Sequence, residues 1–78
     1  MADWYDVAVE VLLQLAESNP TLEREIRMAV RLIERNPRIG AFIQETRHVY
    51  RDPQGRFRIG YNFHPKGTLE VVVINVLT

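Results

Sequence analysis

Residues 48–63 constrain the fold most strongly, because two strand-like runs flank the turn sequence Asp52, Pro53, Gln54, Gly55. In such a turn Asp52 can bond the backbone two residues on, Pro53 presets φ, and Gly55 tolerates a positive φ. After the turn, apolar and polar residues alternate, which predicts a strand with one buried face and one polar, basic face. The apolar set is Phe57, Ile59, Tyr61 and Phe63, and the other set is Arg56, Arg58, Gly60 and Asn62.

The chain has 78 residues with an apolar content of 46%, which predicts a single folded domain over residues 1–78. It contains no cysteine, which excludes disulfides, thiolate metal sites and thiol chemistry; we expect no cofactor and no metal. The first six residues place acids where a signal peptide has bases, and the longest apolar runs are too short to cross a bilayer. We therefore expect a cytoplasmic protein that does not enter the membrane.

Charge is unevenly distributed along a chain whose formal net charge is zero. Residues 1–34 hold seven acids and three arginines, whereas residues 35–66 hold seven bases and two acids. A neutral protein with a basic segment can bind phosphates locally, although long-range steering of a polyanion is weak.

Residues 3–17 fit two structures. At helical spacing, an apolar stripe follows Asp3 as N-cap, and Asp6 lies in the first turn. The stripe is Trp4, Val7, Ala8, Val11, Leu12 and Leu15. At period two, Tyr5 and the three valines after it form a strand face instead. We expect a helix over residues 3–17, with a short leading strand as the alternative.

A second helix is predicted over residues 20–35. Asn19 can cap it, Pro20 suits its first position, and Pro37 ends it by restricting Asn36. Its core-facing stripe is Leu22, Ile26, Ala29, Val30 and Ile33. The link between the two helices is short, so we expect an antiparallel pair.

The rest of the chain is predicted to be β-structure. We expect a loop over residues 38–45 pinned to the core by its apolar residues, then a first strand over residues 46–51. Residues 64–67 have the same x-Pro-x-Gly turn pattern as residues 52–55. The apolar run 68–77 predicts a central strand that is covered on both faces, or one that awaits a partner. The predicted class is α+β, with two antiparallel helices packed on a three-stranded antiparallel β-meander.

Three segments resemble the RelE/ParE superfamily of toxins from type II toxin–antitoxin systems of bacteria. Residues 31–41 resemble its helix end with an Asn/Ser-Pro-Arg-Ile signature, residues 57–61 its aromatic-Arg-x-x-Tyr strand, and residues 70–76 its following apolar strand. The resemblance implies a first strand, which here is residues 2–9 or is lost. It also implies a cognate antitoxin as partner.

In the ribonuclease branch of this family, a motif after the last strand supplies an essential arginine and a tyrosine. The present sequence ends at residues 75–78, where that motif should begin. By position, only Arg58 carries over as a catalytic residue. Other residues that could bind RNA or phosphate lie nearby in sequence: Arg47, Arg51, Arg56, Tyr61 and Lys66.

Arginine side chains on adjacent strands fit a phosphate-binding face, because the planar guanidinium matches phosphate oxygens. The alternative is a solvated sheet face whose arginines pair with Glu45, Asp52 or helix acids. The aromatic residues of this region could stack on bases, but they fall on the apolar face of the alternating strand, which favours a place in the core. Of the two histidines, His48 and His64, either could act as acid or base, and each also suits a turn or edge position.

Two functions follow from the resemblance. The first is a RelE-like endoribonuclease that cuts mRNA at the ribosome, using the 2′-OH of the RNA as nucleophile. The second is a non-catalytic member of the same fold, either a gyrase-type inhibitor or an interaction domain in a shortened or engineered form. The apolar last strand also suggests a homodimer formed through that strand.

Overall fold

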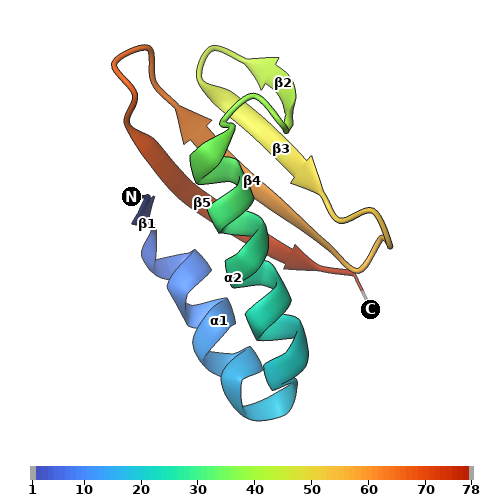
Figure 1. Cartoon of the computed structure of the whole chain (residues 1–78). Coiled ribbons are helices and arrows are strands. Elements are labelled where there is room, and N and C mark those ends of the chain that lie inside the picture. Colours follow the sequence, from blue (N-terminus) through green and yellow to red (C-terminus); the bar gives the residue numbers. More distant parts are fainter. Residues whose placement is uncertain (1, 78) are drawn as a thin grey trace.

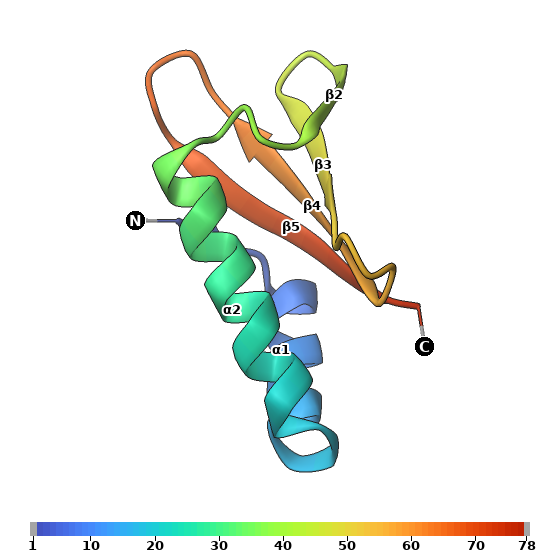
Figure 2. The ribbon, with the colours of Figure 1, turned by 45° about the vertical axis from the view of Figure 1, so that its right-hand side comes forward.

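The computed structural model describes residues 2–77, which form two helices and a five-stranded mixed sheet (Figure 1). The helices are α1 (Asp6–Ser18) and α2 (Pro20–Arg35). The strands are β1 (Asp3–Trp4), β2 (Ala41–Gln44), β3 (Arg47–Arg51), β4 (Phe57–Phe63) and β5 (Leu69–Val76). Their order across the sheet is β1-β5-β4-β3-β2, with β1 parallel to β5 and the other pairs antiparallel. Both helices lie on one side of the sheet (Figure 2).

The α+β class and the pair of helices are confirmed, whereas the three-stranded antiparallel meander is wrong. The three predicted strands are present as β3, β4 and β5, and one further strand lies at each edge. Both added strands are short, with 2 residues in β1 and 4 in β2, too few to give a periodic pattern. Within residues 2–77, no helix is long and apolar enough to cross a membrane.

The core lies between α2 and the central strands. All five residues of the predicted α2 stripe are buried, and they face buried side chains from β4 and β5. The strand residues are Phe57, Ile59, Tyr61, Leu69, Val71 and Ile74. Full burial of each large side chain contributes about 1.5–3 kcal/mol, so this layer is the main source of stability. From α1 only Ala8 is fully buried, and Val7, expected on the apolar stripe, is 58% exposed.

Helix α2 begins and ends where the sequence predicts. The Asn19 side chain accepts a hydrogen bond from the Leu22 N–H at 3.2 Å, and Pro20 occupies the first turn. The helix stops at Arg35, before Asn36 and Pro37. An N-cap bond of this kind is worth about 1 kcal/mol, because it satisfies a backbone donor that has no partner inside the helix.

The N-terminal segment corrects the prediction of a helix over residues 3–17 with Asp3 as N-cap. The first residues form β1 against the start of β5, and α1 begins only at Asp6. Tyr5 takes the N-cap position in an extended conformation, and its N–H donates to the Val71 carbonyl at 2.9 Å. The outer edge of β5 has backbone groups that need partners, and an extended segment satisfies them better than a helical one.

The segment 38–45 corrects a second prediction, because it contains the strand β2 rather than a loop pinned to the core. β2 pairs antiparallel with β3, and all four of its residues are exposed. Its apolar side chains Phe42 and Ile43 are 62% and 52% exposed. The tight return to β3 passes through Glu45, a non-glycine residue with φ of 54°.

The two turns of the predicted meander form as expected. The Gly55 N–H donates to the Asp52 carbonyl at 2.9 Å, and the Gly67 N–H donates to the His64 carbonyl at 2.8 Å. Gly55 and Gly67 have φ of 73° and 92°, a region that suits glycine.

A bulge explains the continuous apolar run of β5. Gly60 pairs with Val73 while Tyr61 pairs with Val71, so Val72 is an extra residue in β5. An extra residue shifts the alternation by one, so residues 69 and 71 before the bulge and residue 74 after it all face the core. The prediction of cover on both faces is wrong, because no element within residues 2–77 covers the side away from the helices. A homodimer through β5 stays a prediction, with β1 already paired to residues 70 and 71.

Tyr61 joins the central strand to the connection between α2 and β2. Its buried hydroxyl donates to the Pro37 carbonyl at 2.6 Å and accepts from the Gly40 N–H at 3.0 Å. Gly40 is required there, because a Cβ would lie 2.5 Å from the Tyr61 hydroxyl oxygen. Burial raises the pKa of Tyr61, which keeps the hydroxyl protonated as a donor.

Replacement of Tyr61 by Phe tests this connection. The variant leaves a buried N–H and a carbonyl without their partner, so we expect the free energy of unfolding to fall by about 1–3 kcal/mol. Tyr50→Phe is the matched control, since the half-buried Tyr50 makes no side-chain hydrogen bond within residues 2–77. Urea unfolding of the two variants measures the difference, and equal stabilities would show that the Tyr61 hydroxyl does not hold the connection.

Candidate functional site

The side of the sheet away from the helices, here called the open face, carries three arginines. Directly opposite residues on antiparallel strands share a face. In the β3–β4 register Arg51 is opposite Arg58, Val49 opposite Gly60, and Arg47 opposite Asn62. The alternation that buries Ile59 and Tyr61 therefore places Arg47, Arg51 and Arg58 together on the opposite side.

The three arginines line one shallow hollow of about 280 Å³. Its remaining walls come from β2, β3, β4 and β5, namely Ile43, Val49, Gly60, Val73 and Asn75. Gly60 gives the hollow its depth, because a Cβ there would lie 2.8 Å from a methyl carbon of Val73. The result is a small hollow lined by apolar residues and by three arginines.

The arginines of the open face have no acidic partner within residues 2–77. The ion pairs in this part of the chain involve Arg27, Arg56 and His64. Arg47 donates only to a neutral group, the Asn62 side-chain oxygen, at 3.0 Å. The alternative of arginines neutralised by nearby acids therefore does not hold for Arg47, Arg51 and Arg58. Opposed like charges on adjacent strands repel, and a bound anion would relieve that repulsion.

Arg56 lies apart from this group. Its Nε donates to the Asp52 carboxylate at 2.8 Å, and its terminal nitrogen pairs with Glu25 of α2. Asp52 is largely buried and also accepts from the Arg56 backbone N–H at 3.1 Å. The Arg56 side chain therefore ties the tip of the β3–β4 hairpin to α2 on the helix side.

Tyr61 and Lys66 are also separated from the open face. Tyr61 is fully buried on the helix side of β4. Lys66 lies in the turn between β4 and β5, beside a different hollow that His64, Pro65 and Thr68 line. That turn and the β3–β4 turn lie at opposite ends of the sheet (Figure 1). Of the residues that the sequence suggested, the structure brings together Arg47, Arg51 and Arg58.

Comparison with known proteins gives a likeness in fold but none in sequence. No model of a protein family matches the chain, and no curated protein does. The isolated E. coli RelE toxin superposes with a TM-score of 0.78 at 12% identity, over 100% of this chain and 84% of that one. The intact E. coli RelBE toxin–antitoxin complex gives a TM-score of 0.78 at 12% identity, over 100% of this chain and 96% of that one. The chain has a RelE-like fold.

The RelE-like fold is the fold that the resemblance of residues 31–41, 57–61 and 70–76 implied. It also accounts for the leading strand, which the resemblance placed within residues 2–9 and which the structure has as β1. At 12% identity the likeness concerns the path of the backbone, so the roles of individual side chains rest on the geometry of this chain.

Three side chains at one end of the open face are joined by hydrogen bonds. The sequence did not reveal this group. Asn62, which accepts from Arg47, donates to the Glu70 carboxylate at 3.2 Å, and His64 Nε2 lies 3.0 Å from the same oxygen. The bond to His64, with that to Asn62, lowers the pKa of Glu70. A histidine oriented by a carboxylate can hold or move a proton. His64 follows β4 directly and lies six residues, or about 20 Å at about 3.3 Å per residue, beyond Arg58, whereas Arg47 is opposite Asn62.

The ion pair of Asp52 predicts a pH dependence of stability. The Arg56 side chain holds the pKa of Asp52 below its ordinary value of 3.8. A carboxyl whose pKa is lower in the folded state than in the unfolded chain stabilises the fold at pH values above the unfolded pKa. That contribution is lost as the pH falls below about 4. We expect Asp52→Asn to be less stable than the parent at pH 6 and to lose less stability between pH 4 and pH 2.

Chemical unfolding at several pH values measures this difference. Glu10→Gln on α1 is the control, because Glu10 is exposed and makes no ion pair within residues 2–77. Parallel pH profiles for Asp52→Asn and the parent protein would contradict the assigned pair.

Proposed function

We propose that this chain is the toxin of a type II toxin–antitoxin pair and cuts mRNA at the ribosome as a RelE-like endoribonuclease. Two observations support the proposal. The fold is similar to that of the E. coli RelE toxin. The open face also presents Arg47, Arg51 and Arg58 around one hollow without acidic partners in the described chain, and the proposal rests mainly on this second observation.

The chemistry suits this arrangement. The 2′-oxygen of one nucleotide attacks the adjacent phosphorus and loses its proton, while the bond from phosphorus to the 5′-oxygen of the next nucleotide breaks and that oxygen gains a proton. Negative charge builds on the phosphate oxygens in the transition state. Arg58 and the facing Arg51 are placed to stabilise that charge, because guanidinium groups donate paired hydrogen bonds to phosphate oxygens. Arg47 extends the same surface toward the next phosphate.

The proposed site does not include three of the residues that the sequence suggested. The hollow is not lined by Arg56, Tyr61 or Lys66. Arg56 and Tyr61 act on stability through their bonds to α2 and to the α2–β2 connection.

The proposed partner is a cognate antitoxin that covers the open face. The RelBE structure is a toxin–antitoxin complex, and one of its chains has the fold of the present protein. An antitoxin segment with acidic residues would neutralise the three arginines, and an amphipathic helix or an added strand could supply them.

Growth arrest on induction tests the proposal. We expect expression of the chain in bacteria to stop growth with ribosome-dependent cleavage of mRNA, and Arg58→Ala to lower the cleavage rate by about 100-fold or more. Arg35→Ala is the matched control, since Arg35 is an exposed arginine at the end of α2, on the helix side of the sheet.

The result separates the candidate functions. Unchanged arrest with a folded Arg58→Ala variant would remove the site. Arrest without mRNA cleavage would instead favour a protein target such as gyrase. Neither arrest nor cleavage would favour an interaction domain, and thermal unfolding checks that the variants fold.

A further inference from the structure

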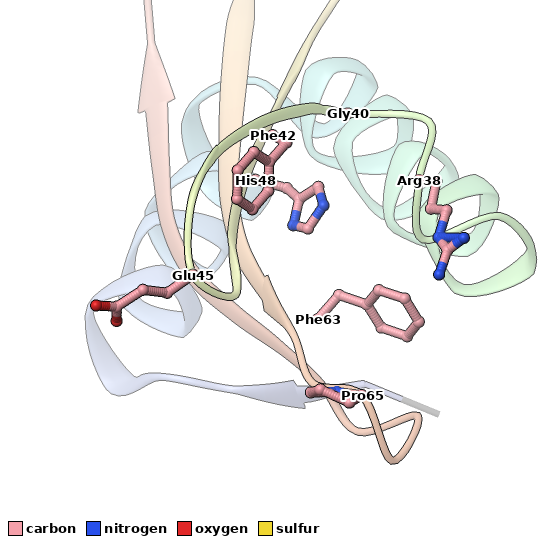
Figure 3. Close-up of a pocket in the computed structure, with 7 residues that line it drawn as sticks. All are labelled: Arg38, Gly40, Phe42, Glu45, His48, Phe63 and Pro65. Atoms are coloured by element: carbon pink, nitrogen blue, oxygen red, sulfur yellow. The ribbon is translucent and has the colours of Figure 1, made fainter.

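A second, larger hollow lies on the helix side of the sheet, beside the exposed strand β2. It has a volume of about 560 Å³, within the range of small-molecule sites. Figure 3 shows the rings of Phe42, His48 and Phe63 around it, with the guanidinium of Arg38 on one side. We call this hollow the aromatic pocket. Its residues lie outside the proposed phosphate site.

The aromatic rings of the pocket are held in place. His48 is only 8% exposed, and its ring stacks on Tyr61 with centroids 5.3 Å apart and planes 16° apart. Phe42 and Phe63 meet the His48 ring edge-on, at 5.6 Å and 6.3 Å. His48 Nδ1 lies 3.0 Å from the Thr46 carbonyl, which can only accept, so Nδ1 carries the proton. His48 Nε2 has no partner within residues 2–77 and is left for a ligand.

Arg38 supplies the charge of the pocket. Its guanidinium carbon lies 6.0 Å from the centre of the Phe63 ring, and it pairs with no acid within residues 2–77. The backbone around it is fixed, because Tyr61 bonds Pro37 on one side and Gly40 on the other. The Glu45 side chain points away from the rings (Figure 3), so it does not neutralise Arg38.

Phe42 gives the pocket an accessible aromatic wall. Its side chain lies on the edge strand β2 and is 62% exposed, and it lines the pocket together with His48 and Phe63. An accessible aromatic ring and an unpaired guanidinium on the walls of one pocket match two parts of one ligand. An aromatic base stacks on the ring, and a phosphate pairs with the arginine.

We infer that the aromatic pocket binds a nucleotide, with its base on Phe42, its phosphate on Arg38 and an edge of the base hydrogen-bonded to His48 Nε2. The ligand is either a free mononucleotide or one nucleotide of an RNA chain. Only the second source rests on the proposed function. A third hollow lies at the β2–β3 turn, and its lining includes Glu45 of the aromatic pocket and Arg47 of the open face. An RNA bound at Arg47 can therefore pass the β2–β3 turn and place a base in the pocket.

Titration of the isotope-labelled protein with AMP, followed by NMR, tests the inference. We expect saturable shifts at the amides of Gly40, Phe42, His48 and Phe63. Ribose 5-phosphate lacks the base and adenosine lacks the phosphate, so each should bind at least about fivefold more weakly than AMP.

Two variants locate the contacts. Phe42→Leu keeps an apolar side chain but removes the ring, and should weaken AMP binding by about fivefold or more. Arg38→Gln should weaken AMP but not adenosine. Arg35→Gln is the matched control and should bind AMP as the parent does. Absence of saturable shifts, shifts confined to the open face, or unchanged affinity in both variants would overturn the inference.

A short oligoadenylate separates the two sources. If RNA is the ligand, the oligonucleotide binds at least about tenfold more tightly than AMP and also shifts Arg47 and Arg51. Equal affinities point to a free mononucleotide, and both results support the pocket. Arg58→Ala should leave AMP binding unchanged, so a failure of mRNA cleavage and a failure of the pocket appear in different measurements.

Discussion

The period-two alternation of β4 is the constraint on which the rest of the structure depends. Its odd-numbered residues from Phe57 to Tyr61 fill the core under α2, and the intervening side chain of Arg58 is exposed on the open face. A slip of one residue would place Arg58 in the core and Tyr61 in solvent, with a loss of most of the buried area. Burial of the aromatic side therefore fixes the position of the basic side.

Tyr61 extends this constraint to the second surface. Its hydroxyl holds the connection between α2 and β2, and its ring supports His48. The Tyr61 side chain therefore fixes the path of the backbone toward β2. It also supports the His48 ring, which lines the aromatic pocket. Arg56 fixes the other end of the sheet through Asp52 and Glu25. With both ends tied to the core, the arginines of β3 and β4 are displayed on a rigid surface, which favours binding of a phosphate chain.

The sequence predicted those parts of the fold that local chemistry determines. The cap at Asn19, the stripe of α2, the two turns and the faces of β4 each follow from spacing and residue type. Strands β1 and β2 were not predictable in this way, because they are short and form only where neighbouring strands leave backbone groups without partners. The bulge at Val72 was hidden for a different reason, because in a continuous apolar run the residues of the two faces cannot be told apart.

The candidate site was predictable where the alternation of side chains between the two faces of a strand determines which residues share a face. Strand register brings Arg51 and Arg58 face to face, and the positions alone suggested this. Nothing in the spacing showed that Arg56 pairs with Glu25, 31 residues away, or that the Tyr61 hydroxyl reaches Pro37. These contacts depend on the packing of α2. Phe42 and Arg38 were not recognised as binding residues, because residues 38–45 were expected to form a loop and Arg38 was noted only as part of the signature in residues 31–41.

The salt dependence of RNA binding tests most directly whether Arg47, Arg51 and Arg58 act as one phosphate-binding surface. For single-stranded RNA, each neutralised phosphate contributes about −0.7 to the slope of log affinity against log salt concentration. Substitution of all three arginines by glutamine should therefore reduce the magnitude of the slope by about 2, with the fold intact. An unchanged slope would contradict the proposed surface.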